Sequence, residues 1–266
     1  MSPVKGILYL SIITIAVMIM NACSKSSTDG TSNNPTGPYS LSYADSIIYL
    51  KDQASDYIVY PIESRTGTYS GFPEGIQIDD ATGAINVSKS ETGLRYRITY
   101  VSPTGETSST LVVISGITFT DNFYHIAAGD SIASPVYNAS IARILPLAGS
   151  IFDDGNGANS GGCSVKTDNG KINLAETIRN GVFGSTPTNN VRRDFDIVYR
   201  LNDGSNKAVN KLKVRLYYYN SMSDVAPDLL QTLSDRQQEG VFIGGKFMGS
   251  NGLAKPRPPC VIIIAN

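Results

Sequence analysis

The sequence predicts a mainly all-β protein, in which a β-sandwich is followed by a second, mostly antiparallel β domain with one or two short helices. Fifteen tyrosines without a tryptophan, together with 25 glycines and 13 prolines, are typical of short strands joined by turns. Apolar and polar residues alternate with a period of two in several segments. Only one segment has the spacing of a longer helix, so strands are expected to form most of the fold.

The first 22 residues have the pattern of a targeting segment. A single Lys5 precedes an uncharged apolar run from Gly6 to Met20, which is shorter than the roughly 20 residues that a spanning helix needs. The run ends in Met20-Asn21-Ala22-Cys23, a small residue directly before a cysteine. This arrangement resembles a bacterial lipoprotein signal, which implies cleavage of residues 1–22 and a lipid anchor, such as palmitate, on Cys23. An ordinary signal peptide and a membrane anchor are the alternatives.

Residues 23–38 are predicted to be a flexible tether, because Ser24 to Pro38 contains no apolar side chain to bury. A linker of this composition has an end-to-end distance on the order of 20 Å. The 22 basic and 23 acidic residues give a net charge of −1, so nothing favours a nucleic-acid partner.

Residues 39–116 contain short strands at regular intervals. Ile47–Leu50 and Tyr57–Ile62 are the first two apolar runs. Ile76 to Val87 alternates on both sides of the turn 79–83, which predicts a hairpin. An alternating strand is expected at 94–100 and a closing strand at 110–114, on either side of the turn 102–105. About seven strands in this span predict a sandwich.

The hairpin and the strand after it carry a motif that resembles the immunoglobulin-like or cadherin-like repeats of bacterial surface proteins. The matching residues are Pro73, Gly75, Ile76, Ile78, Asp79, Thr82, Gly83, Ile85 and Gly93, with Tyr96 and Ile98 shifted by one position. The resemblance implies an Ig-like sandwich fold and no particular ligand. The calcium motifs of that family are missing, so Glu74, Asp79 and Asp80 are interpreted as turn residues and no metal is expected.

Residues 117–266 are predicted to form the second, β-rich domain. Two long alternating segments, 195–201 and 212–218, flank a polar loop and predict an antiparallel pair. Asn173 and Glu176 have the spacing of a helix cap. Ala226, Leu229, Leu230 and Leu233 have helical spacing, and the apolar tail 261–264 predicts a buried last strand. The run from Asn173 to Leu230 resembles a C-terminal module of uncharacterised Bacteroidota lipoproteins and implies no functional residues.

Catalysis finds little support in the residues present. His125 is the only histidine, which excludes a histidine-rich metal site, and we interpret it as structural. Asp153 and Asp154 are adjacent carboxylates, but the glycine-rich segment around them predicts a solvated loop. We therefore expect a protein that is not an enzyme, with no catalytic residue and no cofactor.

The strongest candidate for a recognition surface is one face of the strand near 211–219. Arg215, Tyr217 and Tyr219 can clasp and stack on a ligand such as a sugar, with Lys211 and Lys213 on the same face. The solvent face of an ordinary amphipathic strand is the alternative. Cys163 and Cys260 either pair as a disulfide in an oxidising compartment or remain separate buried thiols.

These features predict a lipid-anchored protein of the outer membrane, facing either the periplasm or the cell surface. We expect a non-catalytic binding or structural module of the cell envelope that contacts a protein partner through exposed strand faces. The alternative is a carbohydrate-binding surface lipoprotein associated with glycan uptake, with a polysaccharide as its partner.

Overall fold

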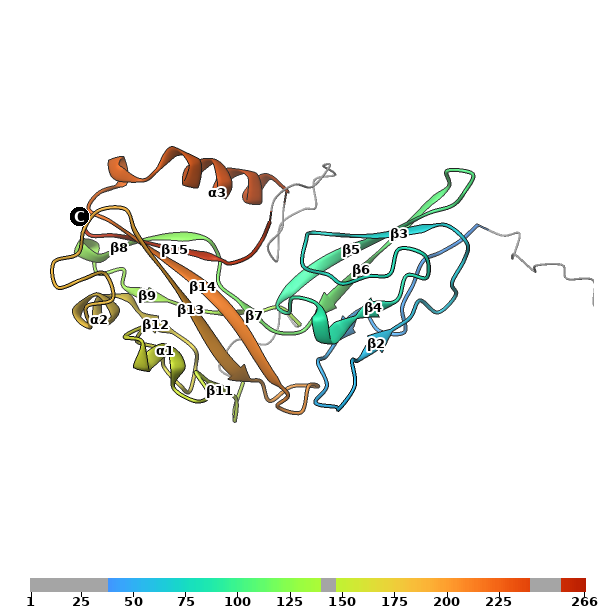
Figure 1. The fold of residues 1–266 in the computed structure, drawn as a ribbon, viewed down its shortest axis with the longest axis horizontal. Coiled ribbons are helices and arrows are strands. Elements are labelled where there is room, and N and C mark those ends of the chain that lie inside the picture. Colours follow the sequence, from blue (N-terminus) through green and yellow to red (C-terminus); the bar gives the residue numbers. More distant parts are fainter. Residues whose placement is uncertain (1–37, 140–146, 240–254) are drawn as a thin grey trace, which may run out of the picture. The chain divides into compact units, whose positions relative to one another are not determined.

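The computed structural model describes residues 38–139, 147–239 and 255–266 (Figure 1). The predicted signal peptide 1–22, the lipidation site Cys23 and nearly all of the predicted tether lie outside the described residues. Among the residues described, no helix has the length and apolar character needed to cross a bilayer.

The described part is mostly β, which confirms the predicted fold class. The strands are β1 (Ile47–Ile48), β2 (Ile58–Val59), β3 (Thr68–Phe72), β4 (Ile85–Asn86), β5 (Leu94–Val101), β6 (Thr107–Ile114), β7 (Ile117–Thr118), β8 (Asn122–His125), β9 (Ile132–Ala133), β10 (Val136–Tyr137), β11 (Ile151–Phe152), β12 (Ile172–Asn173), β13 (Val191–Arg200), β14 (Val209–Tyr219) and β15 (Cys260–Ile264). The helices are α1 (Gly157–Ser160), α2 (Leu174–Arg179) and α3 (Pro227–Glu239), with 3-10 turns η1 (Val87–Lys89), η2 (Ile126–Ala128) and η3 (Met222–Asp224).

The first part of the chain forms a small β-sandwich. One sheet has the strand order β1-β6-β5-β3, and a second sheet consists of β2 and β4. β5 buries every second residue, as its alternation predicts, and these side chains form one hydrophobic core with residues of the smaller sheet. Strand β3 is not predicted by its sequence, because TYSGF contains small and polar residues instead of a regular apolar alternation.

The hairpin predicted at 76–87 is present in a short form. Ile78 and Ile85 form an antiparallel bridge, and the Asp79 amide donates a hydrogen bond of 2.9 Å to the Ala84 carbonyl. Gly83 has φ +74°, and a Cβ there would lie 2.7 Å from the Tyr69 ring, so the turn requires glycine. The Asp79 carboxylate accepts hydrogen bonds from Thr82, which confirms its interpretation as a turn residue.

A five-stranded sheet in the later part of the chain has the order β11-β13-β14-β15-β8 and contains the antiparallel pair that the sequence predicts. Its other half is parallel, because β15 runs parallel to both β14 and β8. The sheet is therefore mixed, where a mostly antiparallel one was expected. The C-terminal strand places five buried residues in the middle of the sheet, as its continuous apolar sequence predicts.

The helices occupy two sides of this sheet. One hydrophobic cluster contains Phe152, Leu174 and Leu216, together with residues around α1 and α2. A smaller cluster on the other face joins Val225 and Leu229 to the sheet, so α3 covers part of that face. Helix α2 begins at its predicted cap, since the Asn173 side chain accepts a hydrogen bond from the Glu176 amide.

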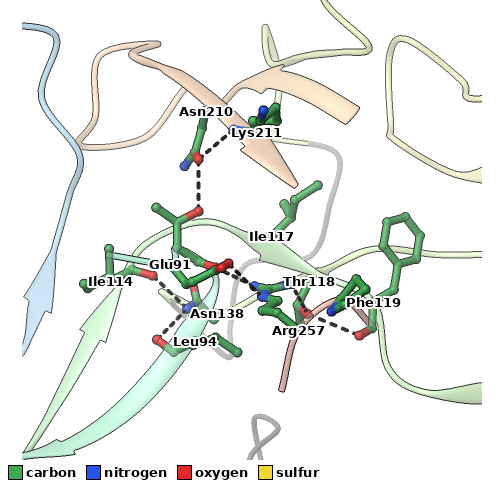
Figure 2. A network of polar contacts seen from close by, with 12 residues as sticks. Glu91, Leu94, Ile114, Ile117, Thr118, Phe119, Asn138, Asn210, Lys211 and Arg257 are labelled. Atoms are coloured by element: carbon green, nitrogen blue, oxygen red, sulfur yellow. Dashed lines mark hydrogen bonds and ion pairs between the residues drawn. The ribbon is translucent and has the colours of Figure 1, made fainter. Parts of the chain in front are cut away.

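A buried polar network joins the sandwich to the following segments (Figure 2). The Asn138 amide group donates hydrogen bonds to the carbonyls of Leu94 (3.2 Å) and Ile114 (3.0 Å), and its oxygen accepts one from the Gly116 amide (3.0 Å). Nearby, the Arg257 guanidinium donates to the Thr92 carbonyl and to the Thr118 hydroxyl. These hydrogen bonds join residues on both sides of the predicted domain boundary between 116 and 117. They do not separate two domains there, so the boundary remains a prediction.

Candidate functional site

The candidate site is a groove of about 430 Å³ between β14 and α3. The three residues proposed from sequence as a ligand face, Arg215, Tyr217 and Tyr219, all border it. They come together because they alternate along β14 with Val214, Leu216 and Tyr218, which point into the main core. The remaining residues that line the groove are Asn190, Arg192, Ala226, Asp228, Leu229, Thr232, Arg236 and Cys260.

Arg215 is held at the floor of the groove by its cross-strand neighbour on β13. Register places Asp194 opposite Arg215, and the guanidinium donates two hydrogen bonds of 2.7 Å to the two carboxylate oxygens. The bond from Arg215 holds the pKa of Asp194 below its usual value, and Asp194 raises the pKa of Arg215. Arg215 is thus pre-oriented, and a ligand must share it with Asp194.

The two tyrosines have different roles. Their rings stack with a centroid distance of 6.3 Å and an interplanar angle of 10°. Tyr219 is fully buried against α3, and its hydroxyl donates a hydrogen bond of 3.1 Å to the Asn190 side chain. Tyr217 is half-buried and keeps part of its ring accessible. Of the two rings, only that of Tyr217 can therefore stack on a ligand, and the buried Tyr219 ring packs beside it. The expectation that both rings stack on a ligand was wrong for Tyr219.

A buried ion pair fixes the wall formed by α3. The Arg236 side chain is 6% exposed and lies 3.1 Å from both oxygens of Asp121, which is 9% exposed. Arg236 also donates to the carbonyls of Lys255 and Pro258, and Asp121 accepts a hydrogen bond of 2.6 Å from the Cys260 amide. These contacts connect α3 to the ends of β8 and β15. The sequence gives no local signal for this pair, because 115 residues separate its members.

Two charged side chains at the groove remain open. Arg192 on β13 and Asp228 in the first turn of α3 are exposed, and within the described part of the chain their charged groups form no hydrogen bond or ion pair. The groove therefore combines an accessible aromatic ring with donors and acceptors that are free to bind. Such a combination suits a polar ligand that has an apolar face.

The lysines predicted on the same face lie outside the groove. Lys211 forms an exposed ion pair of 3.4 Å with Asp196, and Lys213 lies opposite Asp196 in the register. The acidic residues of β13 thus balance the basic residues of β14. This half of the face has the character of an ordinary solvent-exposed strand.

The structure corrects the prediction of a solvated loop at Asp153 and Asp154. Asp153 is buried, and its carboxylate accepts hydrogen bonds from the amides of Ala158 (2.8 Å) and Asn159 (2.9 Å) and from the Asn159 side chain (2.6 Å). It closes the turn that leads into α1. Asp154 instead pairs with Arg200 at 2.6 Å. The prediction was wrong because flexible composition does not reveal an acceptor that neighbouring amides can saturate.

Three further residues considered in the sequence lie outside the groove. His125 ends β8 and pairs in register with Ile264, and its structural interpretation remains a prediction. Cys163 and Cys260 are free and buried, and they belong to different hydrophobic clusters, Cys163 to the main core and Cys260 to the cluster under α3. Of the two alternatives left open by the sequence, the structure has the separate thiols. Burial raises the pKa of Cys163 to about 12 and that of Cys260 to about 11.

Comparisons with known proteins leave the family open. No family model matches the chain, and no curated protein matches it. Among solved structures, it matches a SusE-like surface located polysaccharide binding protein from the Bacteroides thetaiotaomicron heparin utilisation locus, with 12% identity, TM-score 0.25, and coverage of 70% of this chain and 35% of that one. It also matches Drosophila N-cadherin EC1-4, with 12% identity, TM-score 0.21, and coverage of 68% and 50%.

A third match, to the extracellular cadherin domains 3–6 of protocadherin gamma B2, has 12% identity, TM-score 0.20, and coverage of 70% and 49%. The chain spans between about a third and a half of the length of these matched structures. At such TM-scores the matches assign neither a family nor a ligand to this chain.

Proposed function

We propose that this chain is a non-catalytic, lipid-anchored binding module of the cell envelope, and that the groove between β14 and α3 binds a carbohydrate. The observation that carries the proposal is the half-exposed Tyr217 ring in a groove with the open charged groups of Arg192 and Asp228. A sugar ring has an apolar face that stacks on tyrosine and hydroxyls that pair with guanidinium and carboxylate groups. The groove volume of about 430 Å³ falls within the roughly 300–1,000 Å³ typical of small-ligand sites.

The same geometry favours a carbohydrate over a protein bound to an open strand face. Helix α3 covers the end of β14 where Tyr219 lies, and ion pairs neutralise the other end at Lys211. What remains between them is a concave site with one accessible ring. A partner protein that pairs along the whole strand face would have to displace α3.

The non-catalytic part of the proposal depends on the same residues. Glycoside hydrolysis uses two carboxyl groups within about 10 Å of each other on either side of the scissile bond. Next to the groove, Asp194 is engaged by Arg215, and Asp121 is buried under Arg236. Asp228 is the one carboxylate among the described residues that line the groove.

Retention on polysaccharide gels and glycan arrays tests the proposal. The mature protein is expected to bind at least one glycan, and Tyr217→Ala is expected to weaken binding by about tenfold, the equivalent of roughly 1.4 kcal/mol. Tyr60→Ala is the matched control, because Tyr60 is an exposed tyrosine outside the groove. The proposal would be contradicted if no glycan retained the protein, or if Tyr217→Ala and Tyr60→Ala lost the same amount of glycan binding. A protein would then be the favoured partner.

Two further measurements address the other parts of the proposal. Incubation of the protein with a bound glycan is expected to release no reducing ends, and release would show an enzyme. Fractionation of cells is expected to place the protein in the outer membrane, and Cys23→Ala is expected to release it into the soluble fraction. An unchanged membrane fraction for Cys23→Ala would contradict the anchor while leaving the groove untouched.

A further inference from the structure

Strand β2 and the residues after it expose a row of apolar side chains. Ile58 is 40% exposed, Tyr60 is 62% exposed and Ile62 is 70% exposed. They occupy alternate positions, and the residues between them, Val59 and Pro61, are more buried. In an extended chain, alternate positions lie on the same side and follow one another at roughly 6.6–6.8 Å. Three large apolar side chains in one row form a patch, whereas single exposed ones are common on any surface.

The row is continuous with a shallow hollow on the small sheet. Ile58 and Tyr60 line a depression of about 540 Å³ together with Ile78 and Ala84 of the neighbouring hairpin. Polar residues also line it, among them Gln77, Asp79 and Lys89. We refer to Ile58, Tyr60 and Ile62 with this hollow as the β2 face.

The β2 face lies beside the point where the chain joins the predicted tether. The Ile62 amide donates a hydrogen bond of 2.9 Å to the Ser42 carbonyl, and the Tyr39 hydroxyl donates one of 2.6 Å to the Glu63 carbonyl. Tyr43 and Pro61 form a further antiparallel bridge. The most exposed residue of the row is thus bonded directly to the first described segment of the chain.

We infer that the β2 face contacts the surface of the lipid bilayer to which the protein is anchored. The inference rests on the anchor at Cys23 that forms part of the proposed function, and it goes beyond the carbohydrate site. Residues 24–38 contain no apolar side chain that could cover the face, and a linker of their composition spans on the order of 20 Å. An anchored chain therefore keeps the face within reach of lipid.

The chemistry of the face suits the interfacial region of a membrane. Tyrosine is enriched at the boundary between headgroups and acyl chains, and isoleucine side chains gain free energy by leaving water there. Three side chains are too few to bind a membrane by themselves, so the contact depends on the tether that brings them there.

The absence of tryptophan from the chain permits a direct test. The mature protein, beginning at Cys23, is coupled through the Cys23 thiol to vesicles of phosphatidylethanolamine and phosphatidylglycerol that contain a maleimide lipid. Cys163 and Cys260 are buried, so Cys23 is the thiol expected to react. This coupling replaces natural lipidation, and the result therefore does not depend on whether cells lipidate the protein.

Tyr60→Trp then introduces the single tryptophan of the protein into the face. On vesicles with brominated acyl chains, we expect a blue-shifted emission and at least twofold quenching relative to vesicles without bromine. Leu230→Trp is the control, because Leu230 is 40% exposed, as Ile58 is, but lies on α3, and the emission of this variant is expected to stay unquenched. Adding Ile62→Asp to Tyr60→Trp is expected to remove most of the quenching without unfolding, since Ile62 is exposed.

Three results would overturn the inference. The first is that the coupled Tyr60→Trp protein has the same tryptophan emission on brominated vesicles as on vesicles without bromine. The second is equal quenching of the Leu230→Trp protein. The third is a blue shift that appears without vesicles and grows with protein concentration, together with dimers in sedimentation, which would assign the face to a second copy. The glycan-binding and fractionation experiments test the proposed function, and a negative result in either of them can be distinguished from these three results.

Discussion

Asp194 and Arg215 face each other across β13 and β14 and share two hydrogen bonds of 2.7 Å at the floor of the groove. The pair fixes the direction of the guanidinium before any ligand arrives, and it leaves the charge of the groove close to balance. Binding of a neutral sugar is compatible with such a floor, because hydroxyls can accept from Arg215 and donate to Asp194 at the same time.

The pair also makes stability depend on pH. Because Arg215 lowers the pKa of Asp194 in the folded protein, the pair stabilises the fold above the unfolded pKa of about 4, and this contribution is lost as pH falls through the lower folded value. Asp194→Asn is expected to reduce the free energy of unfolding at pH 7 by at most about 1 kcal/mol, since the pair is partly exposed. Urea titrations at pH 7 and at successively lower pH measure this, and a difference that does not shrink as the pH falls would contradict the assignment.

The buried pair of Asp121 and Arg236 is predicted to control α3. Arg236→Met leaves a buried carboxylate without its cation and is expected to destabilise the protein by about 3–5 kcal/mol. Asp121→Asn combined with Arg236→Met removes both charges and is expected to be less destabilised than Arg236→Met alone. Limited proteolysis within α3 and urea denaturation measure both effects, and equal stability of the single and double variants would show that the pair is not coupled.

The neighbouring aspartates before α1 are predicted to behave differently. Asp153→Ala leaves two amides of the α1 turn without their acceptor in a buried position, at a cost of about 1–3 kcal/mol for each unsatisfied group. Asp154→Ala removes an ion pair with Arg200 that is about one third exposed, and the expected cost is below about 1 kcal/mol. Thermal unfolding of the two variants side by side checks the contrast, and equal shifts would restore the solvated-loop interpretation.

Asn138 is predicted to hold the junction shown in Figure 2. Asn138→Ala removes both bonds to the Leu94 and Ile114 carbonyls and the acceptor of the Gly116 amide, so we expect a loss of about 2–4 kcal/mol. Asn180→Ala is a suitable control, because its exposed amide makes one bond to the Gly162 carbonyl and should cost below about 1 kcal/mol. Denaturant curves that fail to separate the two variants would argue against a structural role for Asn138.

The two buried thiols are predicted to be slow to react in the folded protein. Their pKa values are raised by burial, so at pH 8 few thiolates are present and access is blocked. A chromogenic disulfide reagent is expected to label Cys163 and Cys260 only after denaturant is added. Identical migration with and without reductant on a denaturing gel is expected as well, whereas a shift on reduction would show that the cysteines pair.

The sequence by itself determined the parts of this protein that depend on local periodicity and turn chemistry. The alternation along β5, β13 and β14 predicts their buried faces, because successive side chains of a strand point in opposite directions. The hairpin around Gly83 follows from a turn that needs a positive φ, and the start of α2 follows from the Asn173 cap. The same local pattern placed Arg215 and Tyr217 on one face.

Only the tertiary structure decided what that face became. Whether Tyr219 is exposed depends on α3, and the position of α3 depends on Asp121 and Arg236, which lie far apart in the sequence. The insertion of β15 between β14 and β8, which makes half of the sheet parallel, likewise joins segments that no local pattern relates. Periodicity reports which side of an element is apolar, whereas the partner that covers that side is selected by long-range packing, and in this protein that packing converts a strand face into a groove.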